Sequence, residues 1–313
     1  MGPWNAVAGA AILAIVAVDV VHTTLAEGAG PLTRRVTALL WSLARRLAPR
    51  RRFRHRALAA AGALTILTTI FCWFLLVWLG WGLILCAERE AVVTQTDQTP
   101  AEWPQRFYYT GFVMVTLTLE DHEPGEDFYK VITVLATANG FSIITLSLAY
   151  LLPVVQAATH KRQVALTVST LGGTADEILL RAWDGRGFDT LTPYLRDLVS
   201  EINLLTERHQ TYPVLHYFHP RQRDSAPAPM VAVLDEALTL LTRAVTPEHR
   251  PARAVHETLR RALTRYLTTL RIAYISPVDR TPPPPRLEPL AEAGIPLVDE
   301  AEWRRQLDEI EER

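Results

Sequence analysis

Three stretches of this 313-residue chain are long and apolar enough to cross a membrane. Residues 57–86 and 131–159 contain no charged side chain, and residues 4–26 contain only Asp19 and His22 among their ionisable side chains. A helix needs about 20 such residues to cross a hydrocarbon core about 30 Å thick. We therefore predict three transmembrane helices. A secretory signal is the alternative for the first stretch, but its arginines follow the stretch instead of preceding it.

Asp19 and His22 are three residues apart in the first stretch and share one face of the expected helix. Ionisable side chains in a membrane helix face neighbouring helices or water and not lipid. Two interpretations stay open, a proton-sensing pair and a tether near the inner membrane surface.

A cluster of arginines lies between the first and second stretches. Its members are Arg34, Arg35, Arg45, Arg46, Arg50, Arg51, Arg52, Arg54 and Arg56. Such a cluster marks the cytoplasmic side of a membrane protein. We therefore expect a basic cytoplasmic loop, with the N-terminus outside and the C-terminus cytoplasmic. Anionic lipid head groups are the expected partner of the Arg34–Arg56 loop, and nucleic acid is not.

An apolar segment between the second and third stretches is too short to cross. Residues 88–102 are polar, and residues 103–118 are rich in aromatic side chains, with Pro104 suited to the first turn of a helix. About 14 residues should enter the membrane and turn back. Non-helical backbone at that depth is tolerated where it lines an aqueous path. The pattern predicts a re-entrant pore helix followed by a filter loop.

This order of elements resembles the pore of two-helix potassium channels, whose pore helix ends in Thr-Val-Gly-Tyr-Gly-Asp, with a Pro shortly after. The residues in those positions are Thr116, Leu117, Thr118, Leu119, Glu120 and Asp121, and Pro124 follows at the matching spacing. The resemblance covers residues 57–159 and implies a homotetramer. The extra N-terminal span and the runs 151–156 and 209–215 are similar to a bacterial group of potassium-channel-like membrane proteins with helical cytoplasmic tails, which implies a bacterial plasma membrane.

Both filter glycines of the resembled channels are replaced here, by Thr118 and Glu120. A left-handed backbone costs a residue with a Cβ atom about 1 to 2 kcal/mol, so a potassium filter of stacked carbonyls is not expected. The string Thr-Leu-Glu-Asp at 118–121 is instead similar to the filters of bacterial sodium channels and their calcium-selective variants. In those filters a ring of carboxylates meets the partly hydrated ion.

Glu120 and Asp121 would each form a fourfold ring in a tetramer. Two carboxylates about 6 Å apart repel by about 3 kcal/mol at an effective dielectric constant of about 20, so the rings should recruit cations. We expect Na⁺ or Ca²⁺ in preference to K⁺. The alternative is a solvated vestibule that includes Glu123. His122 could tune the rings with pH, or be an exposed loop residue without such a role.

The third span contains residues that could shape the inner half of a pore. Gly140 stands where the resembled channels have a hinge glycine, although it could equally serve close packing. Asn139 could face the cavity. Pro153 lacks a backbone donor and should either kink the helix as a gate or end it. Because regularly spaced arginines are missing from the three stretches, we expect no voltage sensor.

The chain from about residue 161 is polar and has apolar residues at helical spacing. His209, His216 and His219 lie among aromatic residues, where packing is a more common role than metal binding. Prolines between residues 277 and 296 indicate a stiff linker before an acidic helix at 298–313. The expected parts are a first transmembrane helix (1–30), a basic loop (31–56), a pore module (57–160), a helical cytoplasmic domain (161–275), and a Pro-rich linker with an acidic terminal helix (276–313).

The sequence contains no phosphate-binding loop, nucleophile elbow or zinc-ligand spacing, so we expect neither an enzyme nor a cofactor other than permeating cations. The expected fold is an all-α membrane protein with a re-entrant pore helix between its second and third spans. The expected function is a homotetrameric, non-voltage-gated cation channel that passes Na⁺ or Ca²⁺. The alternatives are a non-conducting sensor or scaffold with a degenerate pore, and a potassium channel with an atypical filter.

Overall fold

The computed structural model describes residues 2–26, 28–47, 51–117, 119–220, 222–273 and 283–311, which form two compact units. The N-terminal unit comprises Met1–Val155 and a short later stretch, Tyr212–Tyr217. The C-terminal unit comprises Gln156–Thr211 and Phe218–Arg313. Each unit has its own cluster of buried apolar side chains.

Within the described chain, three helices are long and apolar enough to cross a membrane, as the sequence predicts. They are α1 (Trp4–Thr24), the segment Ala61–Leu85 of α3 (Arg51–Leu85), and α5 (Asp127–Leu171). Large apolar side chains such as Ile15, Leu67 and Phe141 point outward from these helices and are exposed. An apolar outer surface of this kind suits contact with lipid.

Small residues allow α1 and α3 to pack closely. A Cβ atom added to Gly9 would lie 2.4 Å from the carbonyl oxygen of Gly80, and one added to Gly80 would lie 2.8 Å from the side chain of Leu13. The contact continues as a buried cluster that includes Val16 of α1 and Val77 of α3. The first span is therefore packed onto the second and is not a separate anchor.

The basic segment 31–56, expected as a loop, is largely helical: α2 spans Pro31–Leu47, and α3 begins at Arg51. The loop prediction was wrong because a distant residue stabilises the start of α2. The carboxylate of Asp19 accepts hydrogen bonds from the backbone N–H groups of Leu32 (2.7 Å) and Thr33 (3.1 Å). These are donors that the start of a helix leaves without intrahelical partners. Arg50 lies outside the described residues.

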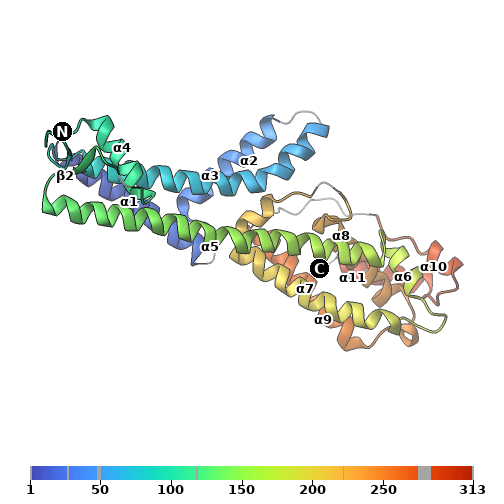
Figure 1. Cartoon of the computed structure of the whole chain (residues 1–313). Helices are drawn as coiled ribbons and strands as arrows, with labels where there is room; N and C mark the ends of the chain where they lie inside the picture. Colours follow the sequence, from blue (N-terminus) through green and yellow to red (C-terminus); the bar gives the residue numbers. More distant parts are fainter. Residues whose placement is uncertain are drawn as a thin grey trace. The chain divides into compact units, whose positions relative to one another are not determined.

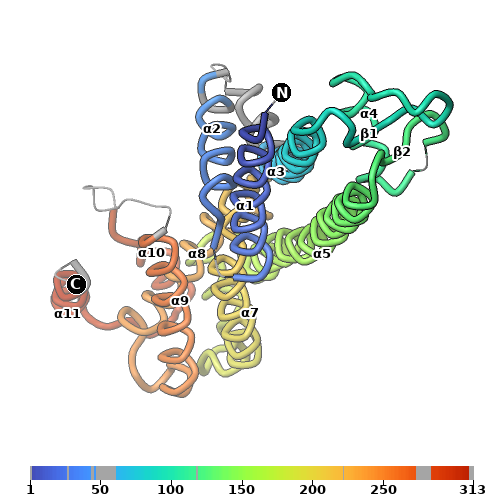
Figure 2. The backbone as a smooth tube through the Cα atoms, turned by 90° about the vertical axis from the view of Figure 1, so that its left-hand side faces the viewer, coloured from blue at the N-terminus to red at the C-terminus, as the bar shows by residue number. Residues whose placement is uncertain are grey.

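Between α3 and α5 the chain forms β1 (Val92–Thr94), α4 (Trp103–Met114) and β2 (His122–Pro124). The three elements lie together beside the first turns of α5 (Figure 1, Figure 2). β1 and β2 pair antiparallel, with Thr94 opposite His122. α4 begins with a capping box formed by Glu102 and Gln105, and Pro104 lies in its first turn as predicted.

The C-terminal unit is helical and surrounds an apolar core. Besides the last part of α5 it contains α6 (Ala175–Ala182), η1 (Asp189–Leu191), α7 (Thr192–Thr211), α8 (Pro227–Thr239), η3 (Leu240–Ala244), η4 (Pro247–His249) and α9 (Arg253–Ala273). α7 packs against α9, and α6 packs against α8. Buried residues recur with the period of a helix, as at Leu195, Leu198, Ile202 and Leu205 of α7.

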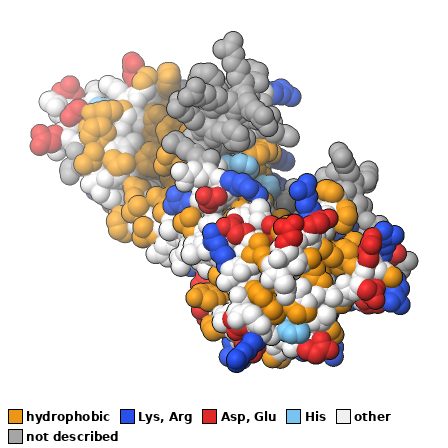
Figure 3. Space-filling model, turned by 90° about the vertical axis from the view of Figure 1, so that its right-hand side faces the viewer, with side chains coloured by type: hydrophobic (Ala, Val, Ile, Leu, Met, Phe, Trp, Pro, Cys, Tyr) orange, Lys and Arg blue, Asp and Glu red, His pale blue; other side chains and the backbone are white. Residues whose placement is uncertain are grey.

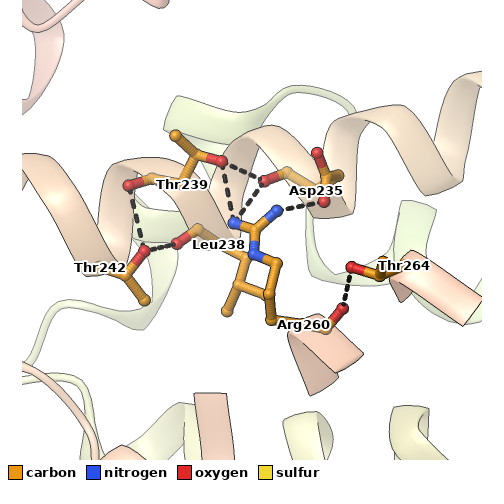
Figure 4. Close-up of polar contacts among 6 residues, drawn as sticks. All are labelled: Asp235, Leu238, Thr239, Thr242, Arg260 and Thr264. Carbon is orange, nitrogen blue, oxygen red and sulfur yellow. Dashed lines mark hydrogen bonds and ion pairs between the residues drawn. The ribbon is translucent and has the colours of Figure 1, made fainter. Parts of the chain in front are cut away.

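Arg260 of α9 links that helix to α8 (Figure 4). Its guanidinium forms an ion pair with the carboxylate of Asp235 and donates a hydrogen bond of 2.9 Å to the hydroxyl of Thr239. Asp235 and Thr239 are one turn apart and share a face of α8. The forked donor group of arginine suits two acceptors placed in this way.

The Pro-rich segment expected as a stiff linker packs onto the C-terminal core in its described part. It contains α10 (Glu288–Glu292), and α11 (Glu300–Glu311) follows where a terminal helix was predicted. Leu290, Ile295 and Trp303 are buried in the core. The linker prediction was wrong for this part because the apolar residues follow a run of prolines and recur with no helical period. On the face drawn in Figure 3, acidic and basic side chains are interspersed with hydrophobic ones.

Candidate functional site

α4 is held between α3 and α5 by specific contacts on two sides. The indole nitrogen of Trp78 in α3 donates a hydrogen bond of 2.9 Å to the carbonyl oxygen of Phe107. Gly82 leaves room for the Phe107 ring, since a Cβ atom there would lie 2.3 Å from it. On the other side, the hydroxyls of Tyr109 and Thr133 in α5 are 3.2 Å apart, within hydrogen-bonding distance. The middle of α4 is therefore held by both neighbouring helices.

Arg106 is a buried cation in α4 whose role the sequence did not reveal. Its guanidinium donates hydrogen bonds to the carbonyl oxygens of Ala101 (2.8 Å), Glu88 (2.7 Å) and Arg89 (2.7 Å). Glu88 and Arg89 follow α3, so the arginine joins the end of α3 to the start of α4. The sequence did offer one indication of this role, because Arg106 is a single cation in an aromatic segment. A cation that is buried there must have hydrogen-bond partners.

α4 ends in a turn with a left-handed residue, Thr116. The N–H of Leu117 donates to the carbonyl oxygen of Phe112 (3.0 Å), and the N–H of Thr116 donates to that of Val113 (3.0 Å). This is a Schellman motif in which Thr116 has φ of 61°. Glycine usually occupies this position, and a residue with a Cβ atom costs about 1 to 2 kcal/mol there. Backbone strain of this kind is often found at functional sites.

The residues after Thr116 divide between interior and surface. The side chain of Leu119 is half-buried and packs against a cluster that includes Leu85 and Tyr109, whereas Leu117 is exposed. Leu119 thereby anchors the loop on one side. Thr118, predicted as a filter residue, lies outside the described residues.

Glu120 and Asp121, the predicted cation ligands, are both exposed. The carbonyl oxygen of Asp121 accepts a hydrogen bond of 3.0 Å from the N–H of Gln95, which follows β1. The backbone of the loop is therefore fixed at the point where the two carboxylates face outward. Neighbouring carboxylates attract cations because each raises the negative potential at the other.

His122 is buried, with 8% of its surface exposed, so the alternative of an exposed loop histidine was wrong. Pairing of β2 with β1 covers the imidazole, a tertiary effect that the local sequence did not indicate. Among the described residues, its ring nitrogens have no hydrogen-bond partner.

Glu123 accepts a hydrogen bond of 2.7 Å from the side chain of Gln98. The Glu123 side chain is therefore held by the segment that follows β1.

Gly140 and Asn139 on α5 are used for packing between helices. A Cβ atom added to Gly140 would lie 2.3 Å from the carbonyl oxygen of Met114, the last residue of α4. The Asn139 side-chain oxygen accepts a hydrogen bond of 3.0 Å from the indole nitrogen of Trp81 in α3. Close packing therefore explains the glycine, and Asn139 holds α5 to α3 instead of facing a cavity.

Pro153 does not end α5, which continues to Leu171, so that alternative was wrong. The residue after it, Val154, is fully buried, and burial offsets the loss of one backbone donor. Tyr150, one turn earlier, lies between two aromatic rings. Its ring centroid is 6.5 Å from that of Trp73 in α3 and 6.1 Å from that of Tyr212.

Asp19 is fully buried, whereas His22 is exposed, so the two do not form a pair. Besides the N–H groups of α2, the Asp19 carboxylate accepts hydrogen bonds from the hydroxyl of Thr33 (2.6 Å) and the indole nitrogen of Trp73 (2.8 Å). Asp19 therefore tethers α1 to α2 and α3. That Asp19 lies near the inner membrane surface stays a prediction.

His209 and His216, two of the three histidines considered as possible metal ligands, pack against aromatic rings. His209 is buried, its ring centroid lies 5.5 Å from that of Tyr266, and His216 packs 5.6 Å from Tyr217. His209 belongs to the C-terminal unit and His216 to the N-terminal unit. In the part of the chain that the structure describes, no group of three or more His, Cys, Asp or Glu side chains is placed to hold a metal ion.

The chain is similar along almost its whole length to the uncharacterized membrane protein YdjJ of Bacillus subtilis (strain 168). The two share 34% identity over 309 residues, which cover 98% of this chain and 90% of the relative. No family model matches the chain, and no solved structure matches it. The relative and the three apolar helices together identify a membrane protein.

Proposed function

We propose that this chain, which belongs to the same family as the membrane protein YdjJ, is one subunit of a non-voltage-gated cation channel. Residues 116–121 would line the narrow part of the ion path, with Glu120 and Asp121 as the groups that meet the ion. Each chain supplies one such loop, so four chains would surround the path, in a bacterial plasma membrane.

The observation that carries this proposal is the fixed end of α4. α4 is too short to span a membrane, and it ends at a strained Thr116 between two apolar helices that are long enough to do so. The C-terminus of a helix carries partial negative charge. It therefore favours a cation near the loop, where Glu120 and Asp121 add full charges.

A ring of carboxylates favours ions that keep part of their water. Four Glu120 side chains would repel one another unless cations or protons reduce their charge. Na⁺ and Ca²⁺ meet these requirements better than dehydrated K⁺, which is selected by closely spaced carbonyls. We propose Na⁺ or Ca²⁺ as the main permeant ion.

The proposed orientation has the N-terminus outside and the C-terminus in the cytoplasm. Arg34, Arg35 and Arg46 of α2 are exposed, as are the apolar Leu39 and Leu43. Basic and apolar side chains on one short helix suit the boundary between lipid tails and anionic head groups. This helix would lie on the cytoplasmic side.

Ion flux through purified protein in liposomes tests the proposal. Wild-type protein should pass Na⁺ or Ca²⁺ faster than K⁺, and divalent ions should impede the monovalent flux. Glu120→Gln keeps the side-chain size and removes the charge, so it should weaken divalent block and lower the preference for cations over anions. Asp121→Asn should have the same effects to a smaller degree.

The matched control is Glu126→Gln, an exposed carboxylate beyond β2 that should leave flux unchanged. Unchanged divalent block in Glu120→Gln would assign this residue to the outer vestibule. A wild-type protein that passes no ion would overturn the channel and favour a membrane sensor or scaffold.

A further inference from the structure

A short segment from the second half of the chain belongs to the N-terminal unit. Residues Tyr212–Tyr217 are part of that unit, although the chain on both sides of them belongs to the C-terminal unit. The segment contains η2 (Pro213–Tyr217), which packs against α3. The run 209–215, which the pore alone does not explain, therefore has a structural role.

The segment is docked by buried apolar and aromatic side chains. Leu215 is fully buried, and Val214 nearly so. At one end, Tyr212 contacts the ring of Tyr150 in α5. At the other end, the ring centroid of Tyr217 lies 5.1 Å from that of Trp41 in α2. One six-residue stretch thus touches α2, α3 and α5.

The contact between Tyr212 and Tyr150 is the one that bears on the proposed pore. Tyr150 lies three residues before Pro153, where α5 lacks one backbone donor and a helix bends most easily. Its other neighbour, Trp73, is held by the buried carboxylate of Asp19. The aromatic series Trp73–Tyr150–Tyr212 therefore runs from the Trp73 indole, which is bonded to Asp19, to the turn of α5 that precedes Pro153.

Tyr212 follows directly after α7, which ends at Thr211 in the C-terminal unit. The end of α7 is firmly held, because His209 is buried against Tyr266 and its Nδ1 lies 2.9 Å from the carbonyl oxygen of Leu205. Pro213 restricts the backbone immediately after Tyr212. The backbone at the start of the segment is therefore restricted, one peptide bond after α7.

We propose that Tyr212–Tyr217 is the segment through which the C-terminal unit regulates the pore. Docking of Tyr212 on Tyr150 sets the conformation of α5 at Pro153, and with it the fraction of open channels. This inference rests on the proposed channel function. It assigns regulation to the inner end of α5 and leaves ion preference to residues 116–121.

The test compares Tyr150→Ala, Tyr212→Ala and the double variant in the liposome flux assay. Each single substitution should change the flux in the same direction by about 2- to 12-fold, the factor that corresponds to one lost aromatic pair. The double variant should change it no more than either single one, because both remove the same contact. The order of preference among Na⁺, Ca²⁺ and K⁺ should stay unchanged.

Tyr212→Phe retains the ring and should behave as wild type, and Tyr194→Ala removes an exposed tyrosine of α7 as a control. Hydrogen exchange on the same samples should be faster at residues 213–217 in Tyr150→Ala. Additive effects, or unchanged flux in a variant whose segment exchanges faster, would overturn the coupling alone. A wild-type protein that passes no ion would overturn the channel and the coupling with it.

Discussion

The indole nitrogen of Trp73 donates a hydrogen bond of 2.8 Å to the carboxylate of Asp19, and both side chains are fully buried between membrane helices. The same carboxylate also accepts hydrogen bonds from α2. A buried charge is tolerated where donors surround it. Asp19 meets this condition, so it organises the first three helices.

Asp19→Asn should destabilise the protein by about 1 to 3 kcal/mol, because one carboxylate oxygen becomes a donor that faces the donors of Thr33 or Trp73. Asp19→Ala should cost more. Thermal unfolding in detergent, followed by circular dichroism, measures the loss. Asp97→Asn changes an exposed aspartate and is the matched control. Equal melting temperatures for Asp19→Asn and the control would contradict the tether.

Thr116→Gly should stabilise the protein by about 1 kcal/mol, since glycine adopts the left-handed conformation without the Cβ penalty. The control is Thr137→Gly within α5, which should destabilise by a similar amount because glycine weakens a helix interior. The melting temperatures of the two variants should therefore move in opposite directions. A lower melting temperature for Thr116→Gly would show that the threonine side chain is needed at this turn.

Single cysteines report the orientation in the membrane. In a background of Cys72→Ala and Cys86→Ala, Gln95→Cys should react with an impermeant thiol reagent added to intact cells. Arg46→Cys should react only after the cells are opened. Both positions are exposed in the folded chain, so a difference reports the side of the membrane and not burial. The reverse pattern would refute the orientation of the whole N-terminal unit.

Acidification should destabilise the C-terminal unit through His256. Burial lowers the pKa of His256, and Arg250, Arg253 and Arg260 lower it further, while Glu257 acts in the opposite direction. The unfolded chain then takes up a proton at a higher pH than the folded chain, so stability falls as the pH drops below about 6.5.

His256→Gln should therefore reduce the drop in melting temperature between pH 7.5 and about pH 5.5. The two proteins should differ less in this pH dependence above pH 7.5, where the imidazole is neutral in both states. Melting curves of both intact proteins at a series of pH values measure this dependence of melting temperature on pH. Identical slopes for wild type and His256→Gln would assign the acid sensitivity to other groups.

The spans and the start of α4 were predictable because they depend on local sequence. Residues 57–86 are apolar for longer than a membrane requires, and Pro104 fits the first turn of a helix that begins at Trp103. Those signals do not depend on the rest of the chain.

The errors arose where a distant residue decides the local structure. Asp19 stabilises the start of α2 across a loop, pairing of β2 with β1 buries His122, and residues before and after Pro153 pack well enough to continue α5. Leu290 and Trp303 pack in the C-terminal core although Pro296 lies between them and prolines precede Leu290. Glu120 and Asp121 are exposed in the single chain, and their action on ions stays a prediction.

The close contact between Gly140 and Met114 divides α5 mechanically. The backbone of Met114 occupies the space that a side chain at residue 140 would need, so α4 and α5 are in direct backbone contact at this level. The turns around residue 140 are therefore closely tied to the end of α4. A bend of α5 at Pro153 would therefore lie beyond the part of the helix that α4 contacts.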